Sequence, residues 1–226
     1  MNTLLITVVP SLIILSYFVF SDKFKEPKGT ILTVFFLGFL ICLPAGILNT
    51  LSESYLNDGS DLSKKLSYSF LGPAWAEELL KFLILYLIVL KRNEFNEPMD
   101  GIVYGVTVSL GFATYENYDY VFRLAELWEI DPYQMAVWRS YSAVPMHGLN
   151  GAIMGFFFGM YSFTANKKYL ILCLLIPFLI HGFYNFLGYP FHYLIVIFAL
   201  IYSFVLHSKL KKLQLSKSKE QETKKI

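Results

Sequence analysis

Acidic residues, histidines and a lysine occur inside stretches of the sequence that are otherwise apolar. Glu77, Glu78 and Lys81 lie in the run GPAWAEELLKFLILYLIVLK. Other apolar runs further along the chain contain Glu116, Asn117, Asp119, His147, His181 and Asn185. A carboxylate can take a proton from water, a histidine can orient that water, and a histidine with a nearby amide can donate hydrogen bonds to a developing oxyanion. These residue types therefore indicate hydrolysis.

The same side chains could instead hold a metal ion. Histidines and carboxylates are common zinc ligands, and a bound zinc supplies an activated water. The candidate ligands are His147, His181 and Glu116. The patterns H-E-x-x-H and G-x-S-x-G are both missing from the sequence, which leaves the zincin and serine-hydrolase interpretations unsupported. A glutamate-base route and a metal-assisted route both stay open.

Spacing along a helix predicts which of these side chains can meet. Lys81 follows Glu77 by four positions and Glu78 by three, so its ammonium can reach both carboxylates. We expect Lys81 to be a structural partner of these acids. The adjacent glutamates point about 100° apart on a helix, which predicts different roles for them. His181 and Asn185 are again four positions apart and can face one point.

The elements that must position these residues are predicted to be membrane-spanning helices. The chain has 226 residues, of which 55% are hydrophobic and 16% are charged, whereas a soluble domain is about a quarter charged. Apolar runs of about 18 or more residues predict spanning helices. We predict an all-α integral membrane protein with seven spans in one bundle, at residues 3–20, 29–51, 70–90, 101–122, 142–163, 169–187 and 189–206.

The polar residues share one depth in this arrangement. At about 1.5 Å of rise per residue, Glu77, Glu116, His147 and His181 lie about 8 to 11 Å inside the outer ends of their spans. Ionisable groups at membrane depth usually serve a function, so we predict one intramembrane site assembled from four spans. A proton-coupled transporter is the alternative, but a single polar layer above the apolar run 82–90 does not form a relay across the membrane.

Basic residues predict the orientation and the role of the C-terminal end. Lysines and arginines are concentrated on the side that holds residues 23–28, 91–92, 167–168 and the tail, which predicts an external N-terminus and a cytoplasmic C-terminus. Residues 1–206 form the predicted domain, and residues 207–226 form a basic, solvated tail near anionic lipid. The tail accounts for much of the net charge of +2, so no nucleic-acid partner is predicted.

Two polar stretches are predicted to lie outside the membrane. Residues 52–69 read as an outer loop. Residues 123–141 mix aromatic and charged side chains, which is typical either of an amphipathic segment in the outer interface or of an aromatic-belt loop.

Taken in order, the polar motifs resemble those of the PrsW family of intramembrane proteases, which is related to the CAAX prenyl endopeptidases. The motifs are EELLK at 77–81, DGIVYGVTVSLGFATYEN at 100–117, HGLNG at 147–151 and HGFYN at 181–185. The resemblance covers roughly residues 72–188. The prenyl endopeptidases have a histidine where this chain has Glu116, in FATYE, and this departure agrees with the PrsW pattern.

The resemblance implies site-1 cleavage of a membrane-anchored anti-sigma factor in a bacterial cell membrane. It places the required residues at Glu77, Glu78, Glu116, His147 and His181. Lys81, Asn117 and Asn185 are supporting candidates, and the two asparagines could equally form hydrogen bonds between helices. Relatives of both metal-dependent and glutamate types are described, so zinc is a candidate cofactor. A CAAX-like protease acting on another peptide is the alternative within this class, and the oligomeric state stays open.

Overall fold

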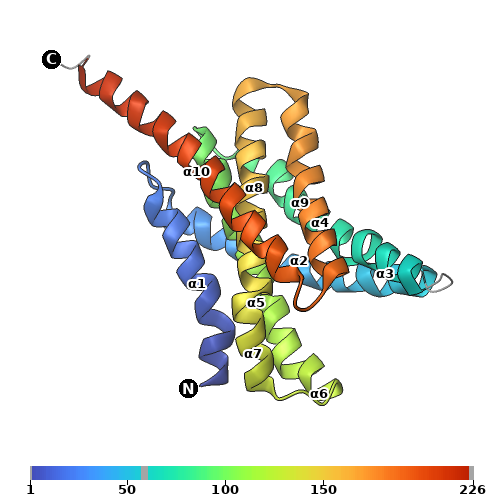
Figure 1. Cartoon of the computed structure of the whole chain (residues 1–226). Helices are drawn as coiled ribbons and strands as arrows, with labels where there is room; N and C mark the ends of the chain where they lie inside the picture. Colours follow the sequence, from blue (N-terminus) through green and yellow to red (C-terminus); the bar gives the residue numbers. More distant parts are fainter. Residues whose placement is uncertain (1, 57–60, 224–226) are drawn as a thin grey trace.

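Helices make up all of the regular secondary structure in the part of the chain that the structure describes, residues 2–56 and 61–223. The structure is a computed structural model. Figure 1 shows that the two termini lie at opposite ends of the bundle, with α6 and α7 at the end that holds the N-terminus. The predicted all-α class is confirmed.

Each long helix overlaps one predicted span. These helices are α1 (Thr3–Ser21), α2 (Lys28–Tyr55), α4 (Trp75–Leu87), α5 (Pro98–Asp119), α8 (Ala143–Thr164), α9 (Lys167–Leu187) and α10 (His192–Thr223). Most differ from the predicted span by a few residues at their ends, but α10 continues past the predicted end at residue 206 to Thr223. Shorter elements join the long helices, namely α3 (Asp61–Ser69), η1 (Phe70–Ala74), η2 (Val89–Lys91), η3 (Tyr120–Leu124), α6 (Ala125–Leu127) and α7 (Pro132–Tyr141).

Four helices within the described residues are long and apolar enough to cross a membrane. They are Thr3–Ser21, Lys28–Glu53, Lys167–Leu187 and His192–Ser216. The count of seven spans is therefore not confirmed and stays a prediction. The other three predicted spans contain the centre of the bundle, where α5 and α8 are almost wholly buried. A helix surrounded by protein does not need the uniformly apolar surface that lipid requires, so α5 and α8 can carry polar residues. The third of these helices, α4, has 13 residues, because η1 interrupts the predicted span before it.

Close backbone contact between α5 and α8 forms the centre of the bundle, and no other pair of helices is in more extensive contact. A Cβ atom built on Gly155 would lie 2.0 Å from the carbonyl oxygen of Gly101, and one on Gly105 would lie 2.3 Å from that of Gly151. Only glycine permits this approach. Small residues at such spacing predict close helix packing, and these two helices show it.

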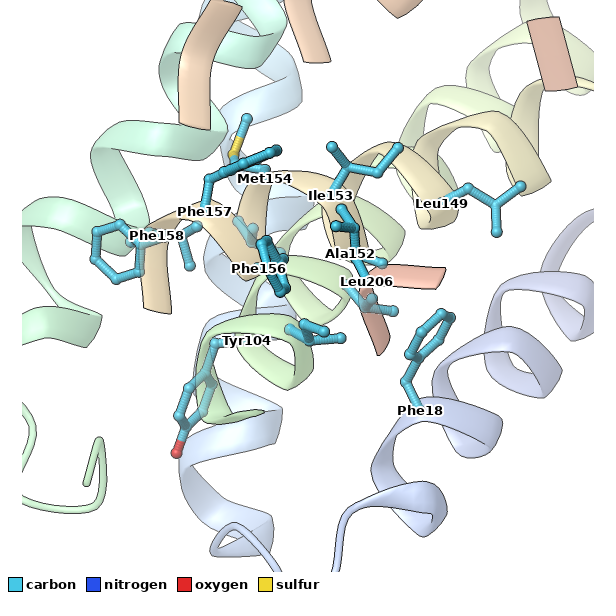
Figure 2. Close-up of a cluster of buried hydrophobic side chains, with 14 of the residues drawn as sticks. Phe18, Tyr104, Leu149, Ala152, Ile153, Met154, Phe156, Phe157, Phe158 and Leu206 are labelled. Carbon is cyan, nitrogen blue, oxygen red and sulfur yellow. The ribbon is translucent and has the colours of Figure 1, made fainter. Parts of the chain in front are cut away.

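Apolar side chains pack around the two central helices. Figure 2 shows part of this cluster, in which side chains of α8 meet others from α1, α5 and α10; the labelled residues are Phe18, Tyr104, Leu149, Ala152, Ile153, Met154, Phe156, Phe157, Phe158 and Leu206. This packing fixes α5 and α8 relative to each other. Those two helices carry Glu116 and His147, so the core sets the geometry of the predicted site.

Residues 123–141 form helices and not a simple loop. The end of α5 passes through η3 into α6, and α7 then begins at Pro132, where the side chain of Asp131 accepts a hydrogen bond from the Gln134 amide at 3.0 Å. On α7, Met135 and Ala136 are buried in a small apolar cluster. The helix packs against α1. The stretch is therefore helical and packed on the bundle, while its position in the outer interface stays a prediction.

Two other stretches differ from the sequence-based expectation. In the predicted outer loop 52–69, α2 continues to Tyr55 and α3 begins at Asp61, while residues 57–60 lie outside the described residues. The predicted solvated tail continues α10, and in it Leu210 and Gln214 are buried. The reason is that Gln214 donates hydrogen bonds to acidic side chains elsewhere in the bundle.

Candidate active site

Four helices bring the predicted polar residues together. The acids Glu77 and Glu78 and the base Lys81 come from α4, Glu116 comes from the end of α5, His147 from the start of α8 and His181 from α9. All of them are buried except Glu116, whose side chain is 15% exposed. The shared depth predicted from the sequence thus corresponds to one cluster in space.

A break in the helix places the two adjacent glutamates. The π-helical segment η1 contains Pro73, and Gly72 has non-helical backbone angles, φ −90° and ψ −114°. Because α4 starts after this break, Glu77 and Glu78 fall in its first turn. The positive end of a helix dipole favours carboxylates there.

Lys81 links the two glutamates of α4 to His147 of α8. Its Nζ atom donates to Glu78 Oε1 at 2.8 Å and lies 3.8 Å from Glu77 Oε2. It also lies 3.0 Å from Nδ1 of His147. Since an ammonium only donates, Nδ1 is the acceptor and the proton of the neutral imidazole sits on Nε2. That nitrogen faces Glu116 Oε2 at 3.0 Å and donates to it.

Glu78 orients the second histidine. Nδ1 of His181 lies 2.9 Å from Glu78 Oε1. A carboxylate only accepts, so Nδ1 carries the proton and Nε2 of the neutral ring keeps a free lone pair. That lone pair lies on the side of Glu77, whose Oε2 atom is 3.9 Å from Nε2. The separation is too long for a hydrogen bond and short enough for one water molecule to bridge the two groups.

Glu77 and Glu78 have different surroundings, as their divergent directions on the helix predict. Glu78 is held between Lys81 and His181. Glu77 accepts one hydrogen bond, from Asn49 Nδ2 to Oε1 at 3.3 Å, while its Oε2 atom has no hydrogen-bond partner. Glu77 is therefore the carboxylate with an oxygen available for chemistry.

Sequence reasoning missed two residues that contact the cluster: Asn49 of α2, which donates to Glu77, and Arg139. From α7, the Nη2 atom of Arg139 donates to Glu116 Oε2 at 2.5 Å and its Nε atom donates to Asn117 Oδ1 at 2.8 Å. The guanidinium also stacks on the Tyr120 ring, 3.8 Å from the centroid. Asp131 followed by Pro132 is a helix-start signal that could have placed Arg139 on a helix next to the site.

Asn117 serves mainly to join helices. Its Nδ2 atom donates to the carbonyl oxygen of Thr7 on α1 at 2.7 Å, and its Oδ1 atom accepts from Arg139. Asp119, one further turn out, forms a more exposed ion pair with Arg123.

A cavity of about 880 Å³ opens onto the cluster. Its lining includes Glu77, Glu116, His147, His181 and Asn185. Glu78 and Lys81 lie behind this lining, in contact with the residues that form it. The structure thus separates residues that a substrate could touch from residues that hold them, while the role of each residue stays a prediction.

The donor atoms are placed to fit a metal ion, provided that His147 gives up one of the two hydrogen bonds that now occupy its ring nitrogens. Glu77, His147 and His181 each offer one ligand atom, and these atoms lie within 4.8 Å of one another. Two imidazoles and one carboxylate form a common protein ligand set of catalytic zinc. The unpartnered Glu77 Oε2 agrees with such a group. Glu116, which the sequence suggested as a ligand, instead pairs with Arg139 beside His147.

The formal charges of the cluster also leave room for a cation. Three carboxylates, those of Glu77, Glu78 and Glu116, face the two cations Lys81 and Arg139. With both histidines neutral, one negative charge is left over. Burying an uncompensated charge is costly, so a proton or a metal ion is expected to balance it.

Comparison with known proteins gives one consistent family. The family model of the PrsW family intramembrane metalloprotease matches residues 26–208. Protease PrsW of Bacillus subtilis is 37% identical over 80% of this chain and 79% of the relative. Protease PrsW of Geobacillus kaustophilus is 35% identical over 80% of this chain and 76% of the relative. No solved structure gives a significant match. These matches favour a protease over the transporter alternative.

Proposed function

The chain belongs to the PrsW family of intramembrane metalloproteases, and from this we propose that it performs site-1 cleavage of a single-pass membrane protein of the anti-sigma-factor type, near the outer face of a bacterial cell membrane. The family membership makes it an intramembrane protease. The observation that carries the proposal is the cluster of Glu77, His147 and His181 on one cavity, backed by fully buried partners.

Glu77 is the general base in this proposal. Its Oε2 atom is unpartnered, and the gap of 3.9 Å to Nε2 of His181 has room for a water held by both groups. Nε2 can accept a hydrogen bond from that water, which turns a lone pair of the water oxygen toward the substrate carbonyl. Glu77 takes the other hydrogen as a proton when the oxygen attacks, and returns it to the amide nitrogen, which leaves as the amine when the C–N bond breaks.

Glu78 and Lys81 position the reacting groups. Glu78 holds His181 in the tautomer that leaves Nε2 free. Lys81 holds His147 in the opposite tautomer, whose Nε2 carries the proton and donates to Glu116. Both partners are fully buried, so these hydrogen bonds do not compete with water. The geometry is therefore set before the substrate arrives, which is how enzymes avoid reorganisation during the reaction.

A metal ion fits the same residues. In this alternative route Glu77 would be a ligand and not the base. Glu77, His147 and His181 would hold a zinc ion, which when bound would act as a Lewis acid and lower the pKa of a coordinated water. Arg139 and Asn185 offer donors on the same cavity for the oxyanion or for the substrate backbone.

The position of the cluster sets where the substrate is cut. By the rise along each predicted span, the catalytic residues lie about 8 to 11 Å inside the outer end. A peptide bond inside a helix is shielded by its own hydrogen bonding, so the substrate has to unwind locally before it can be attacked. We expect cleavage in the outer third of a single span or just outside it.

The test compares membranes from cells with the wild type and with Glu77→Gln, which keeps the shape of the side chain and removes its charge. Quantitative proteomics is expected to find one single-pass protein that is full-length in the variant and shortened in the wild type. The new N-terminus of the shortened form, mapped by mass spectrometry, should fall in the outer third of its span. A co-expressed anti-sigma factor tests the substrate class directly.

Glu53→Gln is the matched control, because Glu53 is an exposed acid that lines the outer part of the same cavity. It is expected to cleave like the wild type. Full cleavage by Glu77→Gln would remove Glu77 from the catalytic set. Cleavage mapped to the cytoplasmic half of the span would contradict the outer position of the site. If the cleaved protein is not an anti-sigma factor, only that part of the proposal has to be replaced.

A further inference from the structure

A second buried cluster of acids lies at the other end of α5 from the catalytic cluster. Asp22 and Glu26 lie in the connection between α1 and α2, and Asp100 lies in the first turn of α5. All three are buried, and each offers an oxygen within 4.8 Å of those offered by the other two. Along α5, Asp100 is about 24 Å from Glu116 by helical rise. The two clusters are therefore separate sites.

Each aspartate uses one carboxylate oxygen in the fold and leaves the other without a partner. Asp100 Oδ2 accepts hydrogen bonds from the amides of Asn96 and Glu97, both at 2.8 Å, as part of the capping box of α5. Asp22 Oδ1 accepts from Gln214 Nε2 at 2.7 Å. The remaining oxygens, Asp100 Oδ1 and Asp22 Oδ2, are buried and accept no hydrogen bond. The fold thus uses only one oxygen of each aspartate, in the cap of α5 for Asp100 and in the contact with Gln214 for Asp22.

The described side chains provide no ion pair that balances the charge of the cluster. Lys25, which lies between two of the acids in sequence, directs its ammonium to the backbone carbonyl oxygens of Val19, Phe20 and Asp22. In the part of the chain whose side chains the structure describes, up to Ser216, the ion pairs do not include Asp22, Glu26 or Asp100. Burial raises the pKa of the Glu26 carboxyl above its usual value, and the negative charge of Asp22 adds to this.

Tyr104 lies one turn after Asp100 on α5 and contacts the cluster. Its hydroxyl donates to Glu26 Oε2, and Figure 2 shows this hydroxyl pointing away from the apolar side chains around the ring. Asp100 and Tyr104 are the acid and the tyrosine of the motif DGIVYG. The catalytic cluster uses neither of them, so this part of the motif serves a different site.

We propose that Asp22, Glu26 and Asp100 bind a hard divalent cation, Mg²⁺ or Ca²⁺, which holds the α1–α2 connection against the start of α5. Carboxylate oxygens are the ligands that these ions prefer, and the two unpartnered oxygens supply the first two. The absence of imidazole among these three ligands distinguishes this site from the catalytic cluster, whose histidines suit zinc. Through Gln214, the same site is linked to α10.

The test uses the full chain in detergent, stripped of metal with a chelator and then titrated with Ca²⁺ alone or Mg²⁺ alone. Calorimetry is expected to show saturable binding of one ion per chain, with a rise in the thermal unfolding midpoint as the ion concentration increases. Asp22→Asn and Asp100→Asn remove a charged ligand and keep its size, and asparagine can still accept the capping hydrogen bonds. Each variant is expected to lose the binding and the shift in midpoint.

Two controls isolate the site. Glu94→Gln changes an acid at the same end of the bundle, which accepts a hydrogen bond from the Thr30 hydroxyl at 3.3 Å, and should bind like the wild type. Glu77→Gln should also keep the response, because it alters only the catalytic cluster. If Asp100→Asn does not fold, Asp22→Asn and Glu26→Gln provide the same test, because neither of these residues belongs to the cap of α5.

Three results would overturn the proposal. The first is a wild type that binds neither ion. The second is binding retained in both aspartate variants. The third is a combination of two results: the wild type responds to neither ion, and the aspartate variants in the absence of metal are more stable than the wild type. That combination would show that shared protons hold the cluster together.

Discussion

Arg139 connects α7 to the catalytic cluster by hydrogen bonds to Glu116 and Asn117. We expect Arg139→Gln to lower cleavage about 10- to 100-fold, as is typical when a residue that orients a catalytic group is lost. Arg139→Lys should restore only part of the activity, because one ammonium does not reproduce the planar fork that bridges two side chains. Cleavage of the identified substrate, with expression level and unfolding midpoint measured in parallel, checks this.

Arg123→Gln is the matched control, because Arg123 forms an i,i+4 ion pair with Asp119 and its side chain is 61% exposed. Exposed pairs of this kind contribute about 0 to 1 kcal/mol, so cleavage should stay near the wild-type rate. Equal losses in the two arginine variants would show that the general positive charge of the outer surface matters, and not the contact with Glu116.

Most residues of the candidate site could be predicted from the sequence because charges are costly at membrane depth. Glu77, Glu78 and Lys81 are conspicuous in one apolar run, and Glu116, His147 and His181 in others; the motif order then agreed with this set. Arg139 could not be found in this way. It belongs to a polar stretch, where an arginine costs little and therefore carries no signal.

At the scale of helices, the glycines between α5 and α8 determine how closely the helices that carry Glu116 and His147 approach. A Cβ atom on Gly155 would lie 2.0 Å from the backbone oxygen of Gly101, and backbone cannot move aside as a flexible side chain can. We expect Gly155→Ala to destabilise the protein by about 1 to 3 kcal/mol and to lower cleavage, since the shift separates His147 from Glu116. Thermal unfolding in detergent and a cleavage assay measure the two effects.

The same substitution at Gly46 of α2 is the control, because a Cβ atom there meets nothing within 4 Å. Alanine is the better helix former, so Gly46→Ala should be as stable as the wild type or slightly more stable. If Gly155→Ala unfolded at the wild-type temperature with full activity, the close contact of α5 and α8 would not be what positions the site.

The positions of the main helices could also be predicted, because apolar runs and their breaks mark where helices begin and end. The partners of polar surface residues could not. Gln214 looks like part of a solvated tail in the sequence, and only the fold places it against Asp22. Likewise, the sequence predicts that Asp100 lies at the start of α5, but it does not predict that two acids of the α1–α2 connection lie next to it.

For the whole molecule, the predicted orientation places the α9–α10 connection outside the cell and the α8–α9 connection inside it. Single cysteines at Tyr189, which is 80% exposed, and at Thr164 test this in a chain without Cys42 and Cys173. The cysteine at position 189 should react with an impermeant thiol reagent in intact cells, and the one at position 164 only after permeabilisation. The reverse pattern would turn the catalytic cavity toward the cytoplasm and contradict cleavage near the outer face.

One helix, α5, carries a buried polar cluster at each end, and this limits how the sequence can change over evolutionary time. A single inserted or deleted residue between Asp100 and Glu116 would rotate one cluster against the other by about 100° and move it by about 1.5 Å. The glycine contacts with α8 would lose their register in the same step. Among descendants of this chain, we therefore expect the connecting loops to vary in length while the spacing between DGIVYG and FATYEN stays fixed. Within this segment, the sequence can therefore change by point substitution but not by insertion or deletion.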